Sequence, residues 1–358
     1  MLCGMDTTWM LYGANGYTGR LIARLAVERG QRPVLAGRSA APVTALAEAL
    51  GLDHRVFALT DASAVRAGLA GVRAVVHCAG PFSATAAPMV EACLATRTHY
   101  LDITGEIDVF EHIHRRDAEA REAGVVLLPG AGFDVVPTDC LAALVAARMP
   151  AADRLDLAFM PGRSLSPGTA KSALEGLALG GRARVGGRIV PVPAGWRSLR
   201  AGFPSGTRTV TSVPWGDVST AYHSTGIRNI TTYTSLPGAT GPARHLQTVA
   251  APLLRRRAVL RAAGHLVDRL VPGTDASRRV HSRAEVWVRA ASIAGETATA
   301  TLTCPDPYDF TADSVLHALA LIVDGAAGPG VHTPSTAFGP RFVNDLDGVT
   351  LTGPVAPA

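Results

Sequence analysis

The stretch "MLYGANGYTGRL", residues 10–21, carries the clearest structural signal in the chain. Three evenly spaced glycines, Gly13, Gly16 and Gly19, follow a short apolar run and precede a segment with apolar residues at helical spacing. A phosphate that approaches the backbone closely needs a turn without side chains, and a helix N-terminus offers it free N–H groups and a positive dipole end. The stretch therefore predicts a strand, a nucleotide-binding turn and a helix, with a purely structural glycine turn as the alternative.

The alternation of strand and helix continues to about residue 136. Short apolar runs that suit strands buried on both faces alternate with segments of helical periodicity. The six runs are residues 9–13, 33–38, 54–59, 73–80, 99–105 and 125–130. This pattern indicates an α/β fold, with a Rossmann-type doubly wound parallel sheet over residues 1–136.

Beyond residue 136 the sequence becomes richer in Thr, Ser, Arg and glycine pairs. The segment "RVGGRIVPV" is typical of a hairpin, and four further runs are typical of antiparallel strands. These runs are residues 207–213, 227–236, 284–293 and 297–304. We therefore expect a second, α+β domain over residues 137–330 that ends with a helix at 309–325. The C-terminal segment 331–358 is expected to pack back on the first domain.

Composition and charge argue against several classes of protein. The net charge is +5, but aromatic residues make up only 5% of the chain, so a nucleic-acid-binding face is not expected. The five cysteines are scattered without a CxxC pair, and His112 and His114 point to different faces of a helix, so neither a disulfide framework nor a metal site is expected. With no signal-like leader and no long apolar run, we expect a cytoplasmic protein.

The residues after the second strand bear on which dinucleotide binds. A carboxylate there would bind the ribose 2′-hydroxyl of NAD, whereas an arginine accommodates the 2′-phosphate of NADP. The chain has Arg38 and Ser39 at this place and no acid, which favours NADP(H) over NAD(H). The alternative is that Arg38 is a solvated surface arginine. Asp61, after the third strand, is either an adenine-side contact or the N-cap of the next helix.

Polar, glycine-bearing turns follow the fourth, fifth and sixth strands: "HCAGPF", "HYLDITGE" and "LLPGAGFDVVPTD". The carboxyl ends of parallel strands meet at one edge of a sheet, where ligands bind. The candidate proton donors are Tyr100, Asp102, Glu106, Asp134, Lys171 and Tyr222. Asp102 and Asp134 could instead cap turns, and Lys171 could be a surface residue. Because Pro167 stands four residues before Lys171, the only lysine, the paired Tyr and Lys of short-chain dehydrogenases are excluded.

In order and spacing, "GANGYTGRL", "HCAGPF", "HYLDITGE" and "PGAGFDVVPTD" resemble the saccharopine dehydrogenase-like superfamily of NAD(P)-dependent oxidoreductases, in the bacterial branch that includes trans-acting enoyl reductases. The resemblance covers residues 9–140 and, more weakly, 166–175 and 333–339. It implies a Rossmann domain that binds NADP(H), and an α+β domain with substrate and homodimer contacts. It places Thr104–Glu106 near the nicotinamide. The expected cofactor contacts are Gly13, Asn15, Gly16, Tyr17, Thr18, Gly19, Arg38, Ser39, Asp61, Ala79, Gly80, Pro81, Phe82, Thr104 and Gly105.

The segment 243–270 spaces leucines on one helical side and concentrates Arg255, Arg256, Arg257 and Arg261. Such a basic amphipathic helix can dock an acidic acyl-carrier protein or an anionic membrane surface, and the alternative is a packed helical pair with a solvated arginine face. Together these features predict an NADPH-dependent reductase that reduces the enoyl C=C bond of a small molecule in lipid or secondary metabolism. An acyl chain linked to a carrier protein or to coenzyme A is one substrate that fits this prediction. An imine reductase on an amino-acid-like substrate and a non-catalytic NADP(H)-binding scaffold or sensor are the alternatives.

Overall fold

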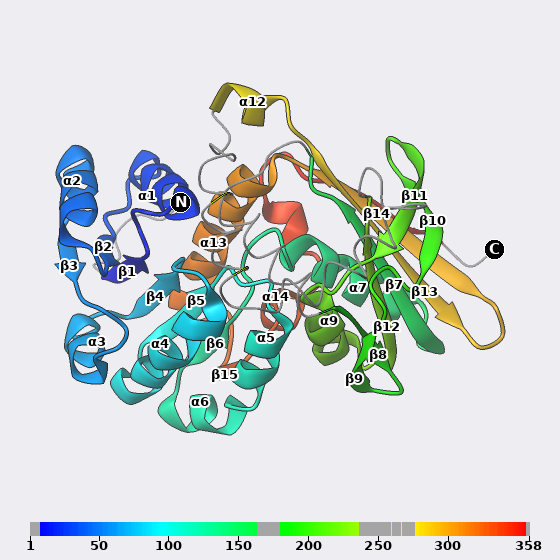
Figure 1. Ribbon diagram of the computed structural model, residues 1–358, viewed down its shortest axis with the longest axis horizontal. Coiled ribbons are helices and arrows are strands. Elements are labelled where there is room, and N and C mark those ends of the chain that lie inside the picture. The colour runs from blue at the N-terminus through cyan, green and yellow to red at the C-terminus, as the bar shows by residue number, and fades with distance from the viewer. Residues whose placement is uncertain (1–7, 163–179, 236–258, 260–265, 267–275, 356–358) are drawn as a thin grey trace. The chain divides into compact units, whose positions relative to one another are not determined.

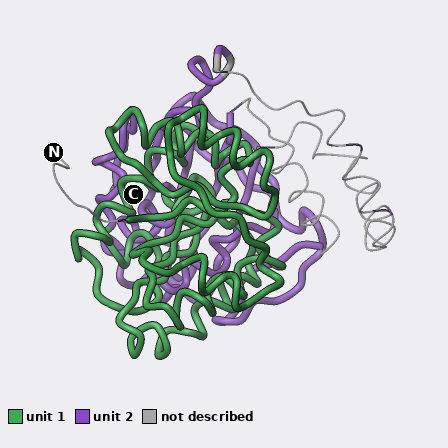
Figure 2. Tube along the Cα trace, turned by 90° about the vertical axis from the view of Figure 1, so that its left-hand side faces the viewer, with its two compact units in different colours: residues 1–136, 308–339 green, residues 137–307, 340–358 purple. Residues whose placement is uncertain are grey.

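The computed structural model describes residues 8–162, 180–235, 259, 266 and 276–355 of the chain. Two compact units make up the protein (Figure 2). Unit 1 comprises residues 1–136 and 308–339, and unit 2 comprises residues 137–307 and 340–358. Among the described helices, none has the length and apolar content needed to cross a bilayer.

In the described part of the chain, unit 1 contains a seven-stranded sheet in which every pair of neighbours is parallel. In spatial order the strands are β15 (Gly330–Val331), β6 (Val126–Leu128), β5 (His99–Asp102), β4 (Ala74–His77), β1 (Trp9–Tyr12), β2 (Val34–Gly37) and β3 (His54–Val56). Strands β1 to β6 confirm the predicted doubly wound sheet, and their spatial order is that of the Rossmann fold. The two-residue β15 is an addition that the sequence did not reveal.

The helices of unit 1 cover both faces of this sheet (Figure 1). They are α1 (Tyr17–Glu28), α2 (Ala40–Leu50), α3 (Ala62–Gly68), α4 (Phe82–Thr96), α5 (Ile107–His114), α6 (Asp117–Ala123), α13 (Pro307–Val323) and α14 (Pro334–Phe338). Figure 1 shows α1 and α13 on one side of the sheet and α3, α4 and α6 on the other.

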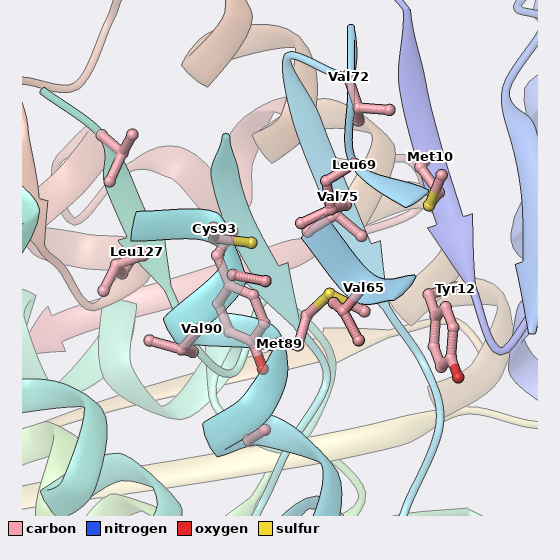
Figure 3. Packing of buried hydrophobic residues seen from close by; sticks show 14 of the residues in the cluster. Met10, Tyr12, Val65, Leu69, Val72, Val75, Met89, Val90, Cys93 and Leu127 are labelled. Carbon is pink, nitrogen blue, oxygen red and sulfur yellow. The ribbon is translucent and has the colours of Figure 1, made fainter. Parts of the chain in front are cut away.

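The core between the sheet and α3 and α4 is built from alternate strand residues, because every second side chain of a strand points to the same face. Met10, Tyr12 and Val75 project from β1 and β4 towards Leu69 and Met89 of the helical layer (Figure 3). Each fully buried side chain of this kind contributes about 1.5–3 kcal/mol. The same residues therefore fix the register that brings the strand ends together at the carboxyl edge.

Unit 2 has a mixed sheet of nine strands within the described residues, arranged as a path of seven with a hairpin beside it. The path is β10 (Ser198–Phe203), β11 (Gly206–Ser212), β12 (Asn229–Thr234), β7 (Ala152–Met160), β13 (Ala284–Ser292), β14 (Thr297–Cys304) and β16 (Thr350–Val355). The predicted glycine hairpin is β8 (Gly181–Val185) and β9 (Arg188–Val192), which pair antiparallel. The helices are α7 (Val136–Arg148), α9 (Asp217–Thr225), α12 (Ala276–Val280) and the 3₁₀ helix η1 (Phe342–Asp345). One pairing differs from the prediction, since β12 runs parallel to β7.

The chain's last part is divided differently from our expectation of a second domain to residue 330 and a tail 331–358 on the first domain. Residues 308–339, including the whole predicted helix, belong to unit 1, and residues 340–358 belong to unit 2. There β16 pairs antiparallel with β14 and extends the second sheet. Helical periodicity shows that α13 has a buried face but not which sheet that face packs against, which explains the error.

Candidate cofactor and catalytic site

The strand order of unit 1 reverses between β1 and β4, which are hydrogen-bonded neighbours although β2 and β3 separate them in sequence. Tyr12 and His77, the last residues of the two strands, are partners in the register. In open α/β sheets, ligands bind at the carboxyl ends of the strands where the order reverses. The loops after β1, β4, β5 and β6 are therefore the candidate site.

The glycine turn after β1 leaves no room for side chains. Gly13 has a φ of +82°, and a Cβ there would lie 2.7 Å from the backbone nitrogen of Ala79 in the loop after β4. A Cβ on Gly19 would overlap the carbonyl oxygen of Gly13. Gly16 is the N-cap of α1, and among the described residues no side chain caps this helix and no acid stands in its first turn. This cradle fits a pyrophosphate, because backbone and helix dipole are open to an anion.

The end of β2 presents Arg38 and Ser39, both exposed. The side-chain oxygen of Asn15 lies beside Gly37, where an added Cβ would be 3.2 Å from it, so the first loop reaches the end of β2. Burial raises the pKa of Tyr12, and the positive charge of Arg38 opposes that shift, which shows that the guanidinium lies within electrostatic range of the β1 end. These positions suit an arginine that binds a 2′-phosphate.

Asp61 is the N-cap of α3. Its carboxylate accepts hydrogen bonds from the backbone nitrogens of Ser63 (2.9 Å) and Ala64 (3.0 Å) and from the Ser63 hydroxyl (2.7 Å). These bonds, led by that from Ala64, lower the pKa of Asp61. Of the two roles considered, the structure contains the helix cap; an adenine contact stays a prediction.

Glu106, at the end of the loop after β5, binds the N-terminus of α4. Its Oε1 accepts from the backbone nitrogen of Phe82 (2.9 Å) and its Oε2 from that of Ser83 (2.8 Å). A negative charge at a helix N-terminus is favourable. Thr85 adds a hydrogen bond of 2.6 Å from its hydroxyl to the carbonyl of Ala79. The turn between β4 and α4, which also contains Gly80 and Pro81, is thus held by a carboxylate from the neighbouring loop.

Asp102, at the end of β5, is fully buried and organises two loops. Its Oδ1 accepts from the backbone nitrogens of Thr104 (3.0 Å) and Gly130 (2.8 Å), and its Oδ2 accepts from the hydroxyl of Tyr100 (2.7 Å). Burial raises the pKa of Asp102 to about 6, although these three bonds oppose the shift. Burial also raises the pKa of Tyr100 well above its ordinary value. The pair, predicted as proton donors, is engaged in holding the loops.

Asp134, after β6, is only partly buried and lies against the loop after β5. Its Oδ2 would be 2.8 Å from a Cβ on Gly105. Desolvation by the surrounding protein raises the pKa of Asp134 to about 7, which is the range that suits a proton donor. Of the predicted acids in unit 1, Asp134 best meets the requirements of a proton donor.

The remaining candidates lie elsewhere. Tyr222 belongs to α9 of unit 2, where the guanidinium of Arg184 stacks over its ring at 4.2 Å. Lys171 lies outside the described residues, as does almost all of the basic segment 243–270. The structure therefore brings together the glycine turn, the turn 79–82, the loop 104–106 and Asp134, all within unit 1.

Residues 9–128, which include all the loops up to β6, match the model of the saccharopine dehydrogenase NADP binding domain. This segment is similar to that family. The trans-acting enoyl reductase of Mycobacterium leprae is 35% identical to the chain over 140 residues, or 36% of this chain and 33% of that protein. The trans-acting enoyl reductase of Mycobacterium tuberculosis is 31% identical over 138 residues, with the same shares. The chain thus matches about a third of the length of these relatives.

Two solved structures share the fold of unit 1 and of unit 2. Saccharopine dehydrogenase (L-Glu forming) from Saccharomyces cerevisiae aligns over 97% of this chain and 100% of its own, with a TM-score of 0.64 and 14% identity. Homospermidine synthase from Legionella pneumophila, solved in complex with NAD, aligns over 97% and 91%, with a TM-score of 0.65 and 10% identity. At these identities the likeness shows the fold.

Sequence reasoning missed two features of unit 1. His77 is fully buried at the end of β4, and neither ring nitrogen has a hydrogen-bond partner among the described residues. Its ring lies 5.6 Å from that of Tyr12 and 5.4 Å from that of Phe82, and burial lowers its pKa to about 3. The second feature is the contact of α13 with the loop after β6, through Thr311 and Ser314. No local motif marks either feature.

Proposed function

We propose that the protein is an NADPH-dependent reductase that reduces the activated C=C bond of an enoyl substrate. The observation that carries the proposal is the chain of contacts along the carboxyl edge of the first sheet. The β1 turn meets the β4 turn at Gly13, the β5 loop holds the β4 turn through Glu106, and the β6 loop meets the β5 loop at Asp134. The names of the mycobacterial relatives support enoyl reduction, and these relatives match over about a third of their length.

Each group has a definite task in this proposal. The glycine turn and the N-terminus of α1 bind the pyrophosphate, and Arg38 pairs with the 2′-phosphate. NADPH, when bound, supplies the hydride. The carboxyl group of Asp134 donates a proton to the substrate atom that receives the electron pair of the reduced bond, and regains it from solvent. Glu106, Asp102 and Tyr100 keep the loops in place and stay unchanged.

The substrate in this proposal is an acyl chain linked to coenzyme A or to a carrier protein. The basic segment 243–270 would dock an acidic carrier, because Arg255, Arg256, Arg257 and Arg261 are clustered within it. Such docking weakens as salt rises, and an association that salt leaves unchanged argues against this partner. We also propose a homodimer, which the molecular mass in solution tests directly.

The test is an assay of NADPH consumption by purified protein with two sets of substrates. One set is an enoyl thioester or an enone alone, and the other is an amine with a carbonyl compound. The proposal predicts turnover with the first set, and at least a tenfold loss in Asp134→Asn with unchanged NADPH affinity. Turnover only with the second set identifies an imine reductase instead. Binding of NADPH without turnover of either set identifies a scaffold or sensor and contradicts the proposal.

A further inference from the structure

The segment between β6 and Asp134 is held by the sheet on one side. The backbone nitrogen of Gly130 donates to Oδ1 of Asp102 at 2.8 Å, and that of Ala131 donates to the carbonyl oxygen of Asp102 at 2.7 Å. Both bonds are buried inside unit 1. They fix the first half of the segment, where it leaves β6, whereas its second half lies next to Asp134.

The helix α13 supports that second half. The hydroxyl of Ser314 donates to the carbonyl of Ala131 at 2.8 Å, and the backbone nitrogen of Phe133 donates to the hydroxyl of Thr311 at 3.0 Å. Ser314 is fully buried and Thr311 is 7% exposed, so water does not replace these bonds easily. The segment before Asp134 is thus bonded from two elements that lie far apart in sequence.

Packing restricts the segment further. A Cβ on Gly132 would lie 2.8 Å from the methyl carbon of Thr311, and the ring of Phe133 meets that of Phe310 edge-on at 6.0 Å. Thr311 therefore uses both of its branches, the hydroxyl on a backbone N–H and the methyl group against a glycine. A rotation of the segment about its backbone would break the bond or force this contact.

The same helix also contacts α1, which follows the glycine turn. The ring of Tyr308 meets that of Tyr17 edge-on at 4.9 Å, and Asp313 pairs with Arg29 at 2.5 Å near the other end of α1. Asp313 and Thr311 thus lie close together on one helix but support different parts of unit 1. This arrangement provides a control on the same element.

We infer that Thr311 and Ser314 are positioning residues for Asp134: their hydroxyl groups fix the backbone of residues 131–133 and so place the carboxyl group of Asp134 against Gly105. The inference rests on the proposed function, in which Asp134 donates the proton. A proton donor must lie within hydrogen-bonding reach of the reacting atom, and a shift of about 1 Å lowers a rate by about 10²-fold. A helix from the chain's last sixth thereby becomes part of a site that is otherwise built by residues before 136.

The test compares Thr311→Val, which removes the hydroxyl and keeps the branched shape, with Thr311→Ser, which keeps the hydroxyl, and with the control Asp313→Asn. The first measurement is amide hydrogen exchange of residues 129–134 in the protein without NADPH. Faster exchange is expected in Thr311→Val, with exchange near that of the wild type in Thr311→Ser and Asp313→Asn. The second measurement is steady-state kinetics with the substrate that the wild type reduces. We expect kcat to fall about 10- to 100-fold in Thr311→Val with unchanged NADPH affinity, and Thr311→Ser to restore it.

The inference is overturned if Thr311→Val keeps the amide exchange rate and the kcat of the wild type. It is also overturned if Thr311→Ser is as impaired as Thr311→Val. Equal faster exchange in Asp313→Asn would also overturn it, since general loosening of α13 then explains the result. A wild type that reduces no substrate defeats the proposed function alone, because the exchange measurement still decides whether Thr311 fixes the segment.

Discussion

Replacing Glu106 by Gln separates a positioning role from mere stabilisation. The wild-type carboxylate accepts bonds from the backbone nitrogens of Phe82 and Ser83 at 2.9 and 2.8 Å. The amide of Gln offers a single oxygen, so one of these N–H groups loses its acceptor, and the negative charge at the start of α4 is lost. The turn 79–82, which closes against Gly13, is then held less firmly.

The cost follows from these two changes. A hydrogen bond to a charged group contributes about 1.5–3 kcal/mol, and a charge at a helix N-terminus adds about 0.3–1 kcal/mol. Since the amide retains one bond, we expect Glu106→Gln to lower the free energy of unfolding by about 2–3 kcal/mol. With an unfolding entropy of about 2.1 cal/mol/K per residue, a chain of 358 residues then loses about 3–4 °C in Tm. A less populated binding-competent turn reduces the affinity for NADPH in proportion, and we expect about tenfold.

Asp117→Asn is the matched control, because Asp117 also accepts a backbone hydrogen bond, from Val331 at 2.8 Å, and pairs with Arg121. Val331 aligns with Leu127 of β6, and its strand β15 lies at the edge of the sheet, separated from β1 and the glycine turn by β6, β5 and β4. The assay is thermal unfolding together with titration by NADPH, followed by nicotinamide fluorescence. Both variants should lose stability, and only Glu106→Gln should lose affinity. Equal NADPH affinity in the two variants would refute the positioning role.

Further predictions concern the turn and the acid. Gly13→Ala should abolish NADPH binding in a titration, because its Cβ would lie 2.7 Å from the backbone of Ala79. Gly30 has a φ of +75°, and no described atom lies within 4 Å of a Cβ placed there. Gly30→Ala should therefore only lower the free energy of unfolding, by about 1–2 kcal/mol in a denaturation experiment. Binding that survives in Gly13→Ala speaks against the cradle. Because the proton donor must be protonated, the rate should fall as pH rises above about 7, and Asp134→Asn should be slow without this decline. Folding raises the pKa of Asp134 from 3.8 to about 7, so between these values the folded state holds a proton that the unfolded state has released. The free energy of unfolding should therefore fall between about pH 4 and 7 and then level off. This slope should be absent from unfolding curves of Asp134→Asn, and its persistence would contradict the assignment.

The sequence revealed the sheet and its glycine turn because both depend on local patterns. Buried parallel strands are continuous apolar runs, and the turn needs glycines at fixed places. Asp61 could be recognised as a possible cap because its partners, Ser63 and Ala64, follow within three residues. Glu106 caps a helix that begins 24 residues earlier, so its sequence neighbours do not reveal this contact.

The position of α13 was wrong in the prediction for a related reason. Its apolar periodicity is satisfied by any apolar surface, and its specific partners, Ala131 and Phe133, stand about 180 residues earlier. The two residues of β15 and the Gly353 and Pro354 within β16 likewise give no pattern typical of a strand. These segments decide where the chain's end belongs, and only the folded structure shows their partners.

The central claim, a nucleotide cradle with Arg38 on the 2′-phosphate, is tested most directly by titrating the wild type and Arg38→Ala with NADPH and with NADH. A hydrogen bond between charged groups contributes about 1.5–3 kcal/mol, and 1.4 kcal/mol corresponds to a tenfold change in Kd. The account predicts that the wild type binds NADPH more tightly than NADH, and that Arg38→Ala loses about 10- to 100-fold in affinity for NADPH while its affinity for NADH stays within about twofold. Equal losses for both nucleotides would contradict the role of Arg38, and a wild type that binds neither would contradict the cradle itself.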